Sequence, residues 1–115
     1  IMSNRKLGVY LSHALFCIDN IRIYTADGES AFLSDRKTQD AVVRNLEVIG
    51  QCVKDAGIDV LQAASPGTDW RAIAAFRNVL AHEYFGVKAD LVWAVVADDL
   101  PALEQALNAL ASSTK

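Results

Sequence analysis

Cysteine is scarce in this sequence, which contains only Cys17 and Cys52 among its 115 residues. Both lie inside helical patterns and are far apart along the chain. Isolated cysteines in such places are usually small buried apolar residues. The sequence therefore predicts no metal or redox role for either thiol.

A metal-ligand cluster is also missing. The two histidines, His13 and His82, share no ligand spacing, and the adjacent Asp98 and Asp99 would point to different sides of a helix. The sequence has no glycine-rich phosphate loop and no nucleophile elbow. We therefore expect a protein without a metal or other cofactor, and we assign no role to His13, which in such a place is usually a packed or surface residue.

Long apolar runs and an excess of positive charge are absent as well. No stretch approaches the ~20 apolar residues of a membrane span, and no signal peptide is present, so we expect a cytoplasmic protein that does not enter a membrane. With 11 basic and 14 acidic residues the net charge is −3. Broad electrostatic attachment to nucleic acid requires many basic contacts. Any RNA-binding site must therefore be local.

Apolar side chains recur at spacings of three and four residues in four stretches, as is typical of amphipathic helices. The predicted core stripes are Leu7, Leu11, Ala14, Ile18 and Ile21; Val42, Leu46, Ile49 and Val53; Trp70, Ile73, Phe76 and Leu80; and Trp93, Val96, Leu103, Leu107 and Leu110. No strand pattern or internal repeat is present. The sequence therefore predicts an all-α fold in one domain, residues 1–115: an antiparallel four-helix bundle, with or without a short fifth helix. The four predicted helices cover about residues 5–26, 35–56, 69–84 and 89–110.

Turn-forming residues define the boundaries of these helices. We expect a short turn at Ser30–Leu33, and Gly57 as the residue with positive φ that ends the second helix. Residues 58–68 combine a short apolar patch with a strong helix breaker, Ser65-Pro66-Gly67. The apolar pattern of the last helix continues across Pro101, which predicts a kink and not a break.

The stretch from Arg77 to Tyr84 places a guanidinium, an amide, an imidazole and a phenol within eight residues. Arginine presents a planar fork of donors that suits phosphate, and histidine exchanges protons near neutral pH. Arg77 and Asn78 begin this stretch, and His82 and Tyr84 end it. The combination favours phosphoryl chemistry.

Helical geometry constrains how these side chains can cooperate. Each residue advances by ~100° around the axis, so Arg77 and Tyr84 share one line, whereas Arg77 and His82 diverge by ~140°. One regular helix cannot close both around a phosphate. Either the helix loosens near His82, or a second copy of the chain supplies the missing side chain.

The motif Arg-x-x-x-x-His-x-Tyr, followed by Phe-Gly-Val, resembles that of the HepT-like branch of the HEPN superfamily. These are all-helical toxins paired with a minimal nucleotidyltransferase antitoxin. The likeness includes Asp35–Val42 and Arg44–Gly50 before the motif, and Leu91–Trp93 and Asp99–Pro101 after it. Two departures are Gln51-Cys52, where the family often has Glu-Ala, and Lys88, where an acidic residue is usual.

The resemblance implies a metal-independent endoribonuclease, acting as a homodimer on RNA. Arg77 would hold the phosphate, His82 would act as general acid or base, and Asn78 would bind the phosphate or orient His82. The nucleotidyltransferase would neutralise the toxin by transferring AMP to Tyr84.

Simpler interpretations remain open for each residue. Arg77 could form a surface ion pair with Asp69 or Glu83, His82 could cap the last carbonyls of its helix, and the ring of Tyr84 could be buried. The chain could also be a noncatalytic subunit that binds a nucleotide or a nucleotidyltransferase.

Overall fold

The computed structural model describes residues 4–83 and 87–114, and every regular element in these ranges is helical. The all-α prediction is confirmed. The elements are α1 (Asn4–Tyr24), α2 (Glu29–Leu33), α3 (Arg36–Ala56), α4 (Ile58–Ala64), α5 (Trp70–Glu83), α6 (Ala89–Ala94), the π-helical η2 (Val95–Asp99) and α7 (Leu100–Ser113).

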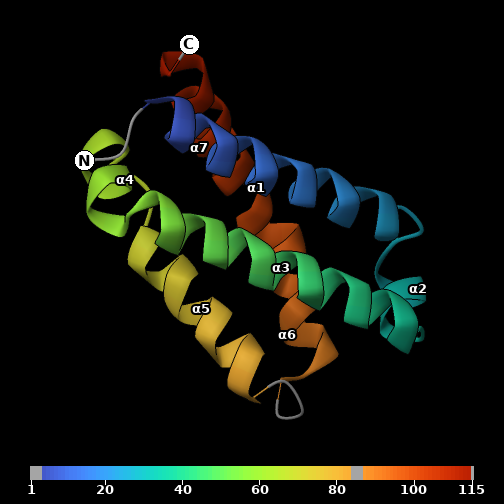
Figure 1. Cartoon of the computed structure of the whole chain (residues 1–115). Helices are drawn as coiled ribbons and strands as arrows, with labels where there is room; N and C mark the ends of the chain where they lie inside the picture. The colour runs from blue at the N-terminus through green and yellow to red at the C-terminus, as the bar shows by residue number, and fades with distance from the viewer. Residues whose placement is uncertain (1–3, 84–86, 115) are drawn as a thin grey trace.

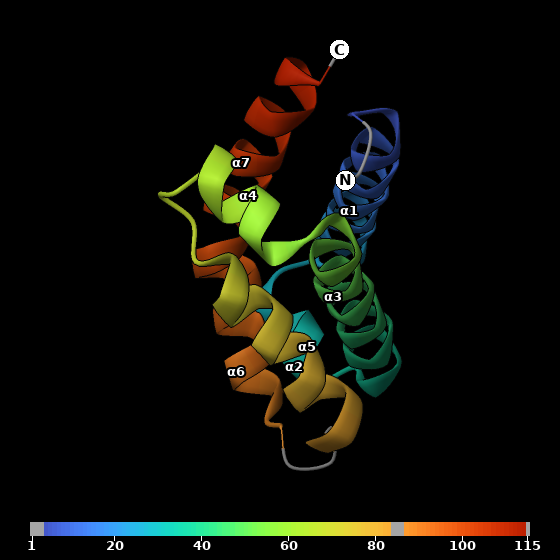
Figure 2. The same ribbon diagram turned by 60° about the vertical axis from the view of Figure 1, so that its left-hand side comes forward.

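Three helices form one layer, with α3 in the middle and α1 and α5 on its two sides (Figure 1). The chain from α6 through η2 to α7 crosses behind this layer in Figure 1, and in Figure 2 α6 and α7 lie on the left with α1 and α3 on the right. α7 packs against α1. The result is the predicted four-helix bundle, supplemented by the short helices α2 and α4. The layer of α1, α3 and α5 has no helix of the chain in front of it in Figure 1.

Most members of the predicted apolar stripes are buried in the core. The half-buried members, which pack against it, are Leu7, Ile73, Phe76, Trp93, Val96 and Leu103. The stripes of α1 and α3 are buried almost completely, and on α5 Trp70 and Leu80 are 0% and 1% exposed. The indole Nε1 of Trp70 donates to the carbonyl of Ser65 at 2.9 Å, so its one polar atom is satisfied. The buried members of the predicted stripes are Leu11, Ala14, Ile18, Ile21, Val42, Leu46, Ile49, Val53, Trp70, Leu80, Leu107 and Leu110.

The predicted boundaries of α3 are also confirmed. The Asp35 carboxylate accepts hydrogen bonds from the backbone N–H groups of Lys37 and Thr38, at 3.1 and 3.4 Å. The hydroxyl of Thr38 also donates to this carboxylate, and these hydrogen bonds lower the pKa of Asp35. Gly57 ends the helix with φ of +102°, a value that favours glycine.

Two short segments differ from the prediction. Ser30–Leu33 is not a turn but most of the helix α2, in which Phe32 is buried and its ring centroid lies 5.5 Å from that of Trp93. The apolar patch after Gly57 becomes α4, in which Leu61 is buried. Helices of one or two turns are unstable alone and depend on such tertiary packing. Local periodicity therefore cannot identify them.

Pro101 lies in the first turn of α7, directly after η2. Its backbone lacks an N–H donor, and the π-helical turn accommodates this gap without ending the helical path. The prediction of a continued helix across Pro101 is confirmed. Within residues 4–83 and 87–114, no helix has the length and apolar character needed to cross a bilayer.

Candidate functional site

Helices α3 and α5 approach each other closely at Gly50 and Arg77. A Cβ atom added to Gly50 would lie 2.3 Å from Cβ and 3.0 Å from Cγ of Arg77, and 3.3 Å from the carbonyl oxygen of Ile73. Real Cβ atoms do not approach other atoms so closely. Glycine is therefore required here, and its missing side chain lets the Arg77 stem lie directly on α3.

Arg77 is half-buried as a whole residue, and its stem lies against α3. Its Nη1 donates to the side-chain oxygen of Asn78 at 3.2 Å. Neither the Arg22–Glu104 ion pair nor the Arg44–Glu47 ion pair involves it. Asp69, one candidate partner, instead accepts from the backbone N–H of Ala72 at 3.0 Å. A half-buried cation without a carboxylate partner among the described side chains is suited to an external anion.

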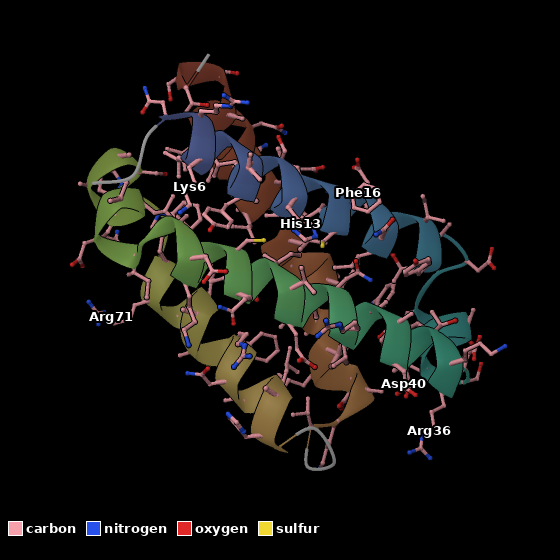
Figure 3. The ribbon with its side chains drawn as sticks, viewed as in Figure 1. Lys6, His13, Phe16, Arg36, Asp40 and Arg71 are labelled. Carbon is pink, nitrogen blue, oxygen red and sulfur yellow. The ribbon has the colours of Figure 1, made fainter. Side chains whose placement is uncertain are left out.

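A cleft of about 370 Å³ lies over α3, between the side chains of α1 and α5. This volume is in the range of small-molecule sites, roughly 300–1,000 Å³. Figure 3 shows His13 on the part of α1 that lies beside α3. The lining residues are Tyr10 and His13 from α1, Arg44, Glu47, Val48, Gln51, Cys52 and Asp55 from α3, and Arg77 from α5.

Gln51, one of the departures from the family pattern, lines this cleft. Its Nε2 donates to Oδ1 of Asp55 at 2.9 Å. The amide of Gln51 adds no charge to the cleft that Arg77 also lines.

The other predicted site residues do not line the cleft. Asn78 and His82 are exposed on α5, and Asn78 contacts Arg77 rather than His82. Arg77 lies against α3 while His82 faces solvent, in line with the divergence expected from the helical pitch. Tyr84 lies outside the described residues. Arg77 therefore lines the cleft, whereas the imidazole of His82 is exposed on α5 outside it.

The two cysteines are buried and unbridged, as the sequence predicts. Burial raises the pKa of both thiols, that of Cys52 to about 11, and the charge of Arg44 partly opposes this rise at Cys17. Neither thiol is therefore a nucleophile at neutral pH. The described part of the chain contains no group of three or more histidine, cysteine and acidic side chains that could hold a metal.

Residues 14–110 match the family model described as "Ribonuclease HepT-like". The chain belongs to the HepT-like family. The match includes α3, α5 and the motif from Arg77 to Tyr84, and begins within α1 just after His13. No solved structure gives a significant match.

HepT-like relatives with curated names include three proteins from archaea and bacteria. The "Gamma-glutamylcyclotransferase and putative RNase" of Methanocaldococcus jannaschii is 35% identical over 88% of this chain and 46% of its own length. The "Probable ribonuclease HepT" of Thermococcus cleftensis is 42% identical over 64% of this chain and 66% of its own. A "Putative RNase" of Caldanaerobacter subterraneus is 31% identical over 92% of this chain and 95% of its own. The chain thus spans about half to two thirds of the first two relatives and nearly all of the third.

The sequence does not identify the α1 side of this cleft. Tyr10 and His13 are more than 60 residues from Arg77, and only the packing of α1 and α5 on opposite sides of α3 brings them into one cleft. The one sequence feature that points to this packing is Gly50, a small residue in the middle of an amphipathic helix. It indicates that another chain segment crosses closely.

Proposed function

We propose that the protein is a metal-independent endoribonuclease in which Arg77 binds the phosphate that is attacked. One observation carries this proposal: the Arg77 side chain lines the cleft and has no carboxylate partner among the described side chains. Its stem lies against α3 because Gly50 leaves room for it. The names of the relatives support RNA as the substrate. The proposed compartment is the cytoplasm, where RNA and ATP occur together.

RNA carries its own nucleophile, the 2′-hydroxyl. Its oxygen attacks the adjacent phosphorus, forming the 2′ O–P bond while the bond to the 5′ oxygen breaks. His82 acts as general base on the 2′-hydroxyl or as general acid to the leaving oxygen, a contribution of ~100-fold to 10,000-fold. Arg77 stabilises the charge of the transition state, and Asn78 positions the guanidinium or binds the phosphate. The products are a 2′,3′-cyclic phosphate and a 5′-hydroxyl.

Cleavage is expected to continue in EDTA, because the mechanism uses only side chains and the substrate's own hydroxyl. The rate of cleavage of a labelled RNA is compared in EDTA and after addition of magnesium or manganese. Activity that is lost in EDTA and returns with either metal contradicts this part of the proposal.

We further propose a two-fold homodimer with the α5 helices and their motifs near the interface. Arg77 and His82 of one chain do not converge, so a complete site needs a His82 from a second chain. The layer of α1, α3 and α5, which no helix of the chain covers in Figure 1, is the available face. Two-fold dimers are the commonest soluble oligomers.

Mixing two inactive variants tests this dimer. If each site combines Arg77 of one chain with His82 of its partner, dissociating and remixing Arg77→Ala with His82→Ala should restore about a quarter of wild-type cleavage. Half of the randomly formed dimers are then mixed, and each carries one intact site of two. If native mass measurement shows mixed dimers but RNA cleavage is not restored, the shared site is contradicted. A monomer at micromolar concentration contradicts the dimer itself.

We propose that the protein is a toxin restrained by a minimal nucleotidyltransferase, which transfers AMP from ATP to the Tyr84 oxygen and releases pyrophosphate. Seven residues separate Tyr84 from Arg77, so a regular helix would place them on one line. A phosphate on the tyrosine oxygen could then reach the guanidinium that RNA needs. The adenylate would block RNA by charge and by bulk.

Incubation with the nucleotidyltransferase and ATP is expected to add mass in units of AMP, with RNA cleavage falling as the adduct accumulates. Intact-mass measurement follows the reaction. Tyr84→Phe should abolish the adduct, whereas Tyr24→Phe, at an exposed tyrosine of α1, should leave it unchanged. An unmodified protein, or an adduct mapped to another residue, contradicts the proposal.

An alternative function is a noncatalytic subunit that holds a nucleotide or a nucleotidyltransferase. The observation that favours it is the separation of Arg77 and His82 within one chain, which leaves the cleft able to bind a phosphate without cleaving it. Highly purified protein that binds RNA or nucleotide but cuts no RNA would support this alternative.

A further inference from the structure

His13 belongs to the same cleft as Arg77, whereas His82 does not. The chain has only these two histidines. His13 comes from α1 and Arg77 from α5, so they reach the cleft from opposite sides of the central helix α3. His13 is exposed, and its ring is accessible to a ligand in the cleft.

The charges of the cleft leave these two groups available to an anion. Two carboxylates line it, and both have partners. Asp55 accepts a hydrogen bond from Gln51, and Glu47 lies 3.8 Å from Arg44. The described ion pairs do not involve Arg77. The two acidic groups thus interact with their own neighbours on α3, while a guanidinium and an imidazole face the open space.

Other side chains that line the cleft suit the base and ribose of a nucleotide. Tyr10 is half-buried and presents an aromatic side chain, and Val48 adds an apolar surface beside it. A base or ribose can pack against such a surface while its phosphate lies between cationic donors. The cleft volume of about 370 Å³ is adequate for one small ligand of this kind.

We propose that this cleft is a nucleotide-binding site in which His13 and Arg77 hold one phosphate group from opposite sides and Tyr10 contacts the attached nucleoside. The site rests on the proposed ribonuclease function, for which it supplies the contact to one nucleotide of the RNA strand. His13, which lies just before the first residue of the family match, becomes a substrate-binding residue.

Proton NMR of the histidine rings tests this site without requiring any cleavage. Inorganic phosphate and adenosine 3′-monophosphate are titrated separately into the 115-residue protein. The Cε1–H resonance of His13 is assigned by its loss in His13→Gln and is then followed during each titration. The resonance should move saturably with both probes, and further with the nucleotide. Arg77→Ala should abolish the response. Arg71→Ala, at an exposed arginine of the same helix outside the cleft (Figure 3), should preserve it.

Two results overturn the site: a His13 resonance that neither probe moves, or one that moves equally in Arg77→Ala. In RNA cleavage, His13→Ala should lower kcat/KM by about 10-fold to 100-fold, the effect of one hydrogen bond to a charged group. Cleavage at the wild-type kcat/KM in this variant also counts against the site but leaves the ribonuclease intact. A saturable His13 response in a protein that cuts no RNA supports the site and contradicts the proposed function instead.

Discussion

Replacing either Arg77 or His82 by alanine is expected to lower RNA cleavage by at least about 100-fold. For His82 the loss is that of a general acid or base, ~100-fold to 10,000-fold. For Arg77 it is the loss of charge stabilisation in the transition state, of the order of 100-fold to 1,000-fold for one such donor. The measurement is the initial rate of cleavage of a labelled RNA by each purified variant.

The helical circular dichroism of both variants should match that of the wild type. His82 is exposed, and Arg77 lies outside the buried core. Arg71→Ala is the matched control, because Arg71 is exposed on the same helix and does not line the cleft. Arg77→Lys should lie between the wild type and Arg77→Ala, since lysine keeps the charge but loses the planar fork. Wild-type rates in His82→Ala or Arg77→Ala contradict the assigned roles.

Gly50→Ala is expected to damage both stability and activity, although alanine is the better helix former. The added Cβ would lie 2.3 Å from Cβ of Arg77 and 3.3 Å from the carbonyl of Ile73, so α5 itself must move. Forcing atoms into a packed contact costs about 1–3 kcal/mol. A displacement of about 1 Å in the position of Arg77 could reduce cleavage about 100-fold. Urea unfolding and the cleavage assay measure the two effects.

Gly8→Ala provides the control for the helix propensity of alanine. Gly8 lies in α1, where a Cβ would meet only the Thr114 hydroxyl oxygen at 3.8 Å, an ordinary contact. This substitution should leave cleavage unchanged and stability equal or slightly higher, because glycine inside a helix costs up to about 1 kcal/mol relative to alanine. Equal behaviour of the two variants contradicts the role of Gly50 in seating Arg77.

The sequence predicts the long helices well because their apolar stripes repeat over several turns. The stripe from Val42 to Val53 is buried as predicted, and the cap at Asp35 and the stop at Gly57 follow from local chemistry. The sequence allows a short fifth helix but does not locate α2 or α4, because each has at most two turns and is stabilised by burying one large side chain, Phe32 or Leu61.

The candidate site was predictable only in the part that is local in sequence. The motif makes Arg77 a candidate site residue, and the divergence of Arg77 from His82 follows from helical pitch. The cleft, in contrast, combines α1, α3 and α5, and the choice of which exposed histidine faces Arg77 depends on how the three helices pack. No periodicity along one helix contains that information, so His13 was assigned no role.

The central claim is that this helical bundle cuts RNA through the substrate's own 2′-hydroxyl. The most direct measurement uses highly purified protein in EDTA with an oligoribonucleotide that it cuts at a mapped position, followed by analysis of the new ends. We predict a 2′,3′-cyclic phosphate and a 5′-hydroxyl, and no cleavage at that position when its 2′-hydroxyl is replaced by hydrogen. A new 5′-phosphate, or unchanged cleavage of the 2′-deoxy substrate, would contradict the account.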